Sequence, residues 1–157
     1  MGTFNCQTNW TGGMSFEAEM RSHKVIMDTR EESGGTNKGA TPKELLLAGI
    51  CGCSGVDVVS IIKKMRLNLE HFDVQATTET TDGYPSIFRE VQLSFRIKSS
   101  DAKPEQVVKA VNLSMTKYCG VSAMVAPTSP ITYQVFLNDE KIGEGKADFS
   151  AEQEKAF

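Results

Sequence analysis

The sequence predicts one domain, residues 1–157, that mixes β-strands with α-helices. Apolar and polar residues alternate in several short segments, as in strands, and a long capped apolar run predicts a helix between them. A chain of 157 residues with 39% hydrophobic composition is long enough to bury a core without disulfides. The net charge of -3 comes with no basic stripe, so we expect no nucleic acid among the partners.

Strands are predicted for the first thirty residues. A turn at residues 21–23 should separate two of them, which leaves His23 exposed. Residues 31–40 are polar, rich in glycine and without a period, which predicts a surface loop. Apolar and polar residues alternate over residues 14–21, which predicts a strand with one apolar face and one solvent-exposed face. The apolar positions are Met14, Phe16, Ala18 and Met20.

A long helix is predicted to follow this loop. Thr41 has the character of an N-cap, Pro42 suits the first helical position, and Glu44 can reach back to close a capping box. The helix should continue to about Arg66. Because residues 45–62 are apolar nearly all round, we expect this helix to be buried at the centre of the fold.

The second half of the chain predicts strands around a further helix. Alternating patterns indicate strands near residues 72–78 and 91–97, with a turn at 82–85 between them. A second helix is expected over about residues 104–117, where a proline suits the first turn. Residues 131–137 alternate again and predict the last strand.

The N-terminus lacks the charged and apolar regions of a secretion signal. No apolar run is expected to reach the roughly 18 residues that cross a membrane. We therefore expect a soluble, cytoplasmic protein with no membrane partner.

Four cysteines in a reducing compartment are expected to bind metal, act in catalysis or fill the core. Metal has the least support, because Cys51 and Cys53 would point roughly 200° apart on a helix. Neither His23 nor His71 stands at a ligand-like spacing from a cysteine. We therefore expect no metal site and no cofactor, and we interpret Cys6 and Cys51 as small apolar fillers.

Cys53 and Cys119, 66 residues apart, have more distinctive surroundings. Cys119 ends a Lys-Tyr-Cys segment just after the second predicted helix, where a buried filler is the alternative interpretation. Asp57 lies one turn beyond Cys53 on the same helix face, where it could accept a hydrogen bond or face a partner chain. Together the two thiols suggest a redox enzyme.

Three glycines surround Cys53 on the predicted helix. They lack side chains, so another backbone or a small molecule could approach the sulfur closely. Close packing of a buried helix is the alternative explanation. The three are Gly49, Gly52 and Gly55.

In this order, the segments resemble the OsmC/Ohr family of osmotically induced and organic hydroperoxide resistance proteins, most closely its YhfA-like subgroup. The resemblance runs through residues 42–47, 52–61, 117–119 and 121–124 and covers nearly the whole chain. It implies an α+β fold, an OsmC-like intertwined homodimer in which strands of both chains wrap around long central helices.

The resemblance also implies a thiol-dependent peroxidase that reduces organic or hydrogen peroxides in oxidative stress. By motif, Cys53 takes the place of the cysteine that attacks the peroxide, and Cys119 that of the resolving cysteine. The attack would leave a sulfenic acid on Cys53, which becomes a disulfide with Cys119 that an outside thiol reduces. The implied partners are a second copy of the chain, a small-molecule peroxide and an external thiol reductant.

The chain departs from the hydroperoxide resistance pattern at two positions. Met14 stands where those proteins carry an arginine, and Lys43 stands where they carry a glutamate. A reactive thiol needs a nearby cation or helix N-terminus to lower its pKa. Arg30 is the candidate substitute for the arginine, and Glu44, one residue after the family position, is the candidate for the glutamate, although capping alone would explain it.

Two other functions stay open at this point. The chain could be a non-enzymatic or stress protein of the same fold that binds a small apolar ligand in the glycine-lined pocket. Cys53 could also serve another sulfur reaction, such as persulfide handling. Thiols that ignore peroxide, together with specific retention of a ligand, would favour the binding protein.

Overall fold

The computed structural model describes residues 2–153. These residues form an α+β structure with two sheets, which confirms the predicted fold class. The chain divides into two compact units, one up to Leu47 and one from Ala48 onward. That residues 1–157 act as a single domain stays a prediction.

The first unit contains a three-stranded antiparallel sheet with the order β1-β2-β3, formed by β1 (Gln7–Gly12), β2 (Ser15–Met20) and β3 (His23–Met27). The predicted alternation is present, but Ala18 is the buried member of the set. Phe16 on β2 is 40% exposed and its cross-strand neighbour Trp10 is 67% exposed. Part of the apolar face of this sheet, around Trp10 and Phe16, is therefore exposed.

The predicted loop after β3 is organised by one buried carboxylate. It contains the short 3₁₀ helix η1 (Glu31–Ser33). Asp28 accepts hydrogen bonds from the Thr29 amide at 2.8 Å, the Thr36 amide at 3.0 Å, the Thr36 hydroxyl at 2.7 Å and the Lys38 amide at 3.1 Å. The Thr36 hydroxyl, helped by the three amides, holds the pKa of Asp28 well below its usual range.

Asp28→Asn is expected to lower the thermal stability of the protein at neutral pH. The folded-state pKa of Asp28 is lowered, so its stabilising effect is present above the ordinary value of 3.8 and is lost as the pH falls through the folded value. The difference in melting temperature between the wild type and the variant should stay constant from about pH 7 to about pH 5 and begin to narrow as the pH falls from about 4 to about 3. Parallel curves would contradict this explanation.

Helix α1 (Pro42–Lys64) begins where the sequence predicts. The capping box is confirmed, because the Thr41 amide donates to the Glu44 carboxylate at 2.7 Å and the Glu44 amide donates to the Thr41 hydroxyl at 3.3 Å. The predicted burial on all sides is wrong for the single chain, since Val56 is 70% exposed. One stripe is buried, at i, i+4 spacing: Ile50, Ser54, Val58 and Ile62.

The length and composition of α1 also correct the expectation about membrane spans. Within the described residues, α1 is long and apolar enough to cross a membrane by those two measures. The central helix of a soluble protein meets the same criterion. This feature alone therefore does not indicate a membrane protein.

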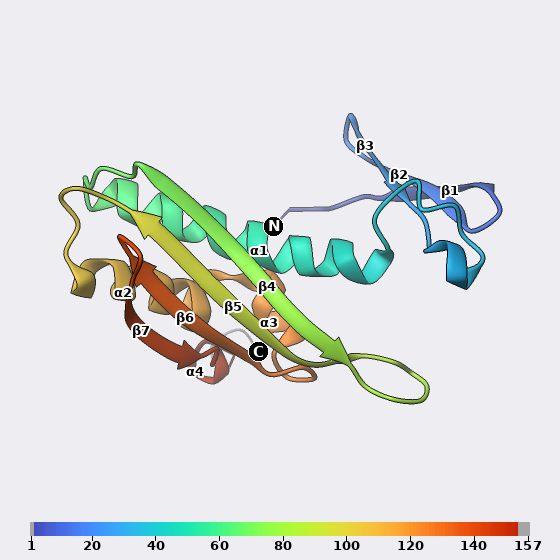
Figure 1. The fold of residues 1–157 in the computed structure, drawn as a ribbon. Coiled ribbons are helices and arrows are strands. Elements are labelled where there is room, and N and C mark those ends of the chain that lie inside the picture. The colour runs from blue at the N-terminus through green and yellow to red at the C-terminus, as the bar shows by residue number, and fades with distance from the viewer. Residues whose placement is uncertain (1, 154–157) are drawn as a thin grey trace. The chain divides into compact units, whose positions relative to one another are not determined.

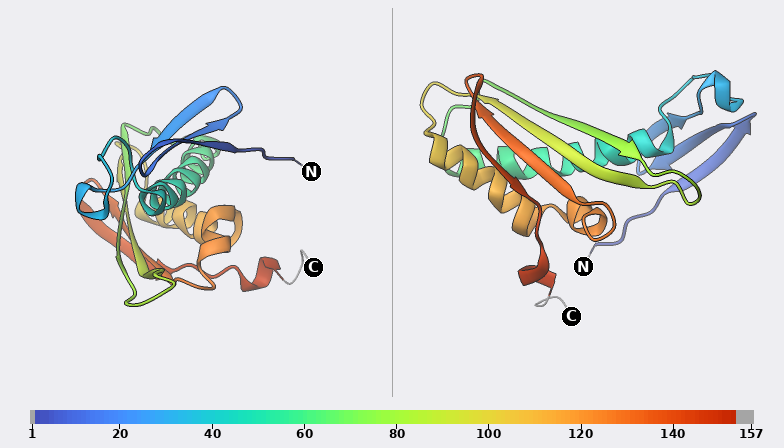
Figure 2. Two further views of the ribbon diagram at one scale, coloured as in Figure 1. Left: turned by 90° about the vertical axis from the view of Figure 1, so that its right-hand side faces the viewer. Right: turned by 60° about the horizontal axis from the view of Figure 1, so that its bottom comes forward.

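The second unit is built on a four-stranded sheet with the order β4-β5-β6-β7, formed by β4 (His71–Thr80), β5 (Phe88–Lys98), β6 (Ile131–Leu137) and β7 (Glu140–Lys146). The β5 and β6 strands are parallel, and the other pairs are antiparallel. Helices α1 and α2 (Pro104–Leu113) lie on one face of this sheet (Figures 1 and 2). The alternating residues of β5 and β6 point into the core between the layers, with Phe95 and Val135 fully buried.

The parallel connection from β5 to β6 runs through α2, η2 (Ser114–Tyr118) and α3 (Gly120–Val125), and the described chain ends with α4 (Ser150–Gln153). The sequence predicts a regular α-helix as far as Lys117, but residues 114–118 form a wider π-helical turn. The Cys119 amide donates to the Ser114 carbonyl, five residues back, at 3.0 Å. This turn sets the direction in which Cys119 leaves the helix.

The prediction that residues 131–137 form the last strand is wrong, because β7 follows. Asn138 and Asp139 form the turn, with φ of 51° and 71°. Asn and Asp tolerate this left-handed conformation better than other non-glycine residues, which permits a tight hairpin. The strand itself contains two glycines and four charged residues, a composition with low strand propensity.

Candidate functional site

The fold brings the two predicted redox cysteines together. Cys53 lies in the middle of α1, and Cys119 lies between η2 and α3. The two sulfurs and a carboxylate oxygen of Asp57 all lie within 4.8 Å of one another. All four cysteines are free thiols, so this is the reduced form of the site. These three residues are called the thiol cluster below.

Helix α1 supplies two members of the thiol cluster. Cys53 and Asp57 are four residues apart and therefore share one face of the helix. The Ser114 hydroxyl donates a hydrogen bond to Asp57 Oδ2 at 3.1 Å and lies 3.4 Å from the Ser54 carbonyl oxygen. Of the two predicted roles of Asp57, the structure supports the hydrogen-bond acceptor, and this contact ties η2 to α1.

The Cys119 thiol is held by the first turn of α3. Its sulfur accepts a hydrogen bond from the Ser122 amide at 3.4 Å and donates to the Ser122 hydroxyl at 3.1 Å. The side chain is fully buried, whereas Cys53 is half-buried. A reagent from solution therefore reaches the sulfur of Cys53 more easily than that of Cys119.

Burial is the main influence on the pKa of two members of the thiol cluster, Cys119 and Asp57. It raises the pKa of the Cys119 thiol to about 11, an effect that Ser122 opposes and the nearby Cys53 reinforces. Burial also raises the pKa of Asp57, although the hydrogen bond from Ser114 lowers it in part. At neutral pH Cys119 is therefore a protonated thiol that is shielded from water.

The other two predicted site residues lie in the first unit and meet each other there. Arg30 Nη2 lies 3.6 Å from Glu44 Oε1. The pKa of Glu44 is lowered first by the Thr41 amide and hydroxyl and then by Arg30. The structure thus pairs Arg30 with Glu44, and it pairs Cys53 with Cys119. That Arg30 and Glu44 influence the thiolate stays a prediction.

The remaining cysteines differ from their predicted role as fillers. Cys6 is exposed, so that prediction is wrong for it, because the segment before β1 is not covered in the single chain. Cys51 is half-buried and lines an apolar hollow of about 660 Å³, together with Val56, Phe72 and Val74. Burial raises the pKa of the Cys51 thiol.

The glycines of α1 divide between the two predicted explanations. A Cβ at Gly55 would lie 3.6 Å from Phe72 and 3.7 Å from Val74, so this glycine permits ordinary close packing against β4. A Cβ at Gly49 or Gly52 would have no neighbour within 4 Å among the described residues. Packing within one chain therefore does not explain Gly49 and Gly52.

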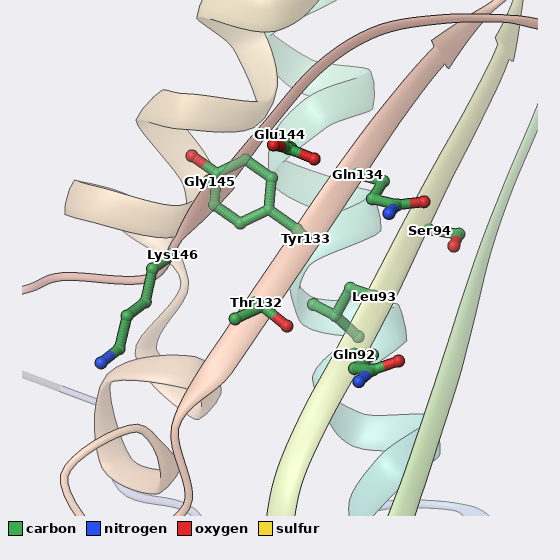
Figure 3. Close-up of a pocket in the computed structure, with 9 residues that line it drawn as sticks. All are labelled: Gln92, Leu93, Ser94, Thr132, Tyr133, Gln134, Glu144, Gly145 and Lys146. Atoms are coloured by element: carbon green, nitrogen blue, oxygen red, sulfur yellow. The ribbon is translucent and has the colours of Figure 1, made fainter.

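A second hollow lies on strands β5, β6 and β7 (Figure 3). Its lining includes the polar side chains of Gln92, Thr132 and Gln134 on neighbouring strands and of Glu144 and Lys146 on β7. Neither cysteine nor histidine is among the nine residues that line it. It offers no thiol for redox chemistry, so the thiol cluster is the candidate active site.

Two serines of the site were not predicted from the sequence. Ser122 has only a weak local signal, because it lies three positions after the N-cap Cys119 but is not the glutamate or glutamine of a capping box. Ser114 has no local signal, because its partners Ser54 and Asp57 are more than fifty residues away in the chain. Its role depends on the packing of η2 against α1.

Comparison with known proteins agrees with the motifs. Residues 35–134 match the family model described as OsmC-like protein. The chain is 35% identical over 128 residues to protein YhfA of Escherichia coli K12, a match that covers 81% of this chain and 92% of YhfA.

Two solved structures share the fold at low sequence identity. An OsmC-like protein from Mycoplasma pneumoniae has a TM-score of 0.76 at 16% identity, with 87% of this chain and 97% of that chain covered. An organic hydroperoxide resistance protein from Elizabethkingia anophelis has a TM-score of 0.66 at 18% identity, with 89% and 98% covered. On the family match and the identity to YhfA, this chain belongs to the OsmC/Ohr family of OsmC-like proteins.

Proposed function

We propose that the protein is a thiol-dependent peroxidase that reduces organic or hydrogen peroxides. One observation carries this proposal: the sulfurs of Cys53 and Cys119 lie within 4.8 Å of each other as free thiols. A disulfide requires a bond of about 2 Å, so a small side-chain movement could join them. The name of the related Elizabethkingia anophelis protein supports an organic hydroperoxide as one substrate.

The exposure of the two thiols assigns their roles in this proposal. Half-buried Cys53 attacks the peroxide, because a peroxide from solution can reach it. Its sulfur breaks the oxygen-oxygen bond and takes one oxygen as a sulfenic acid, and the alcohol or water leaves. Buried Cys119 then gives its proton to the departing hydroxyl group and forms the disulfide, releasing water. An external thiol reduces the disulfide and completes the cycle.

Peptide mass mapping tests this proposal. The reduced protein is treated with one equivalent of cumene hydroperoxide and, separately, of hydrogen peroxide, and the disulfide is then located. We expect a bond between Cys53 and Cys119, with Cys6 and Cys51 still reduced. Four unreacted thiols would overturn the peroxidase. That result would favour the binding protein, for which the apolar hollow beside Cys51 is the candidate ligand site.

The proposed enzyme acts as a homodimer in the cytoplasm. In the single chain, apolar side chains stay exposed in both units, including Trp10 and Phe16 on the first sheet and Val56 on α1. A methyl group added at Gly49 or Gly52 would likewise have no neighbour within 4 Å in the described chain. A second copy would cover such surfaces, which are unusual on a monomer. A reducing compartment would supply the external thiol.

Val56→Asp is expected to convert the dimer into monomers. A carboxylate at a 70% exposed apolar position leaves the single chain intact but would be buried without a partner in the dimer. Light scattering coupled to size exclusion gives the molar mass. Tyr84→Asp is the matched control, since Tyr84 is fully exposed in the loop between β4 and β5. A monomeric wild type, or a dimeric Val56→Asp variant, would contradict the dimer.

Arg30→Gln tests the predicted cation of the thiolate environment. If the guanidinium favours the thiolate of Cys53, alkylation of Cys53 by iodoacetamide near neutral pH should slow by about tenfold. Arg89→Gln is the control, because Arg89 also forms a surface ion pair, 3.6 Å from Asp82. An unchanged alkylation rate would restrict Arg30 to its pairing with Glu44.

A further inference from the structure

We propose that the reduced thiol cluster binds a thiophilic divalent cation, Zn²⁺, through the sulfurs of Cys53 and Cys119 and the carboxylate of Asp57. This inference goes beyond the peroxidase, because the ion would bind without any peroxide. In the sequence, Cys51 and Cys53 are the nearest pair of thiols, and their side chains point in different directions on a helix, which disfavours a metal site. The folded chain instead places Cys53 beside the Asp57 carboxylate, one helical turn away, and beside the Cys119 thiol, which is distant in the sequence.

The distances within the thiol cluster suit this ion. Zinc binds cysteine sulfur at about 2.3 Å and carboxylate oxygen at about 2.0–2.2 Å, so two ligands of a tetrahedral site lie roughly 3.5–3.8 Å apart. The three candidate ligand atoms already lie within 4.8 Å of one another. Side-chain movements of about 1 Å would bring them to zinc distances. Water can supply the fourth ligand, because Cys53 and Asp57 are half-buried rather than sealed.

A metal ion would have to displace the proton of each thiol, after which three negative groups would converge at one half-buried place. Asp57 accepts a hydrogen bond from the neutral Ser114 hydroxyl, and Cys119 contacts the neutral Ser122. Among the described residues, no ion pair joins Asp57 to a lysine, arginine or histidine. A divalent ion would neutralise two of the charges and displace the thiol protons.

The hydrogen bonds around the cluster hold two of the ligands in place. Ser114 donates to the Asp57 carboxylate at 3.1 Å, which orients the carboxylate. The Ser122 amide donates to the Cys119 sulfur at 3.4 Å, a contact that a thiolate retains. Metal ligands in proteins are usually held by such outer hydrogen bonds. These partners are already in position in the reduced chain.

Zinc and the disulfide exclude each other, because each needs both sulfurs. Oxidation of the zinc dithiolate by one hydroperoxide consumes two protons and gives the disulfide, one alcohol, one water and free Zn²⁺. The peroxide is reduced by two electrons and the two sulfurs are oxidised by one each. Bound zinc would therefore shield Cys53 until an oxidant releases the ion.

Cobalt(II) is the spectroscopic probe for this site. The fully reduced protein is titrated with CoCl₂ under anaerobic conditions. We expect one Co²⁺ per chain, with sulfur-to-cobalt charge-transfer absorption and the visible bands of a four-coordinate ion, and we expect Zn²⁺ to displace it. Asp57→Asn, Cys53→Ser and Cys119→Ser should each weaken Co²⁺ binding at least about 100-fold. Cys51→Ser, on the same helix, is the matched control and should bind as the wild type does.

Alkylation of the wild type provides a second test that does not depend on a variant folding. Zn²⁺ should protect Cys53 from iodoacetamide and leave Cys6 fully reactive, as peptide mass mapping would show. The proposal is overturned if no charge-transfer band appears, or if Asp57→Asn binds Co²⁺ as tightly as the wild type. Neither test contains peroxide, so its result is independent of whether the protein is a peroxidase.

Discussion

Cys53→Ser is expected to abolish peroxide turnover. A serine hydroxyl is not ionised at neutral pH and does not attack the oxygen-oxygen bond, so the first step of the proposed reaction is lost. The consumption of cumene hydroperoxide in the presence of an external thiol should fall by at least about 10³-fold, to the rate of the free thiol alone. Ferrous xylenol orange measures the remaining hydroperoxide directly.

Two controls separate this loss from damage to the fold. Cys51→Ser removes a half-buried thiol two residues away on the same helix and should keep its full activity. The circular dichroism spectrum of Cys53→Ser should match that of the wild type, because the side chain changes by a single atom. If Cys53→Ser keeps its activity and Cys51→Ser loses it, then the nucleophile is Cys51 and not Cys53.

Cys119→Ser has the second-largest expected effect, on the resolving step. The variant should consume one equivalent of peroxide per chain in a burst and then stop, since its sulfenic acid on Cys53 has no internal thiol to react with. Dimedone should label Cys53, and steady-state turnover with millimolar external thiol should fall by at least about 100-fold. The reason is that the Cys119 sulfur is held beside Cys53, whereas an external thiol has to reach Cys53 from solution.

The fold of Cys119→Ser needs its own check because this side chain is fully buried. A serine hydroxyl can keep the hydrogen bonds to Ser122, so we expect the thermal stability to change little. Cys119→Ala is the companion variant, which removes the polar atom altogether. If both variants fold and turn over peroxide as fast as the wild type, then Cys119 is not the resolving cysteine and the disulfide mechanism fails.

Local patterns were sufficient for much of the fold. The start of α1 could be predicted because Thr41 and Glu44 form a capping box from neighbouring residues, and the core positions of β5 follow from simple alternation. Strand β7 was missed because its stabilisation comes from pairing with β6, while all of its residues except Ile142 are charged or glycine. The exposed side of α1 was mispredicted because apolar composition does not say whether the same chain covers it.

In the candidate site too, some features follow from local sequence and others depend on tertiary contacts. The sequence by itself determined the family and singled out Cys53 and Cys119 as the candidate redox pair, because the motifs are local and occur in a distinctive order. The tertiary structure alone decided that Cys119 and Ser114 reach the face of α1 that carries Cys53 and Asp57, and that Cys119 is buried while Cys53 is half-buried. These properties depend on the π-turn of η2 and on the packing of η2 against α1, which join residues more than fifty positions apart in the chain. No pattern within a short segment encodes such a distance.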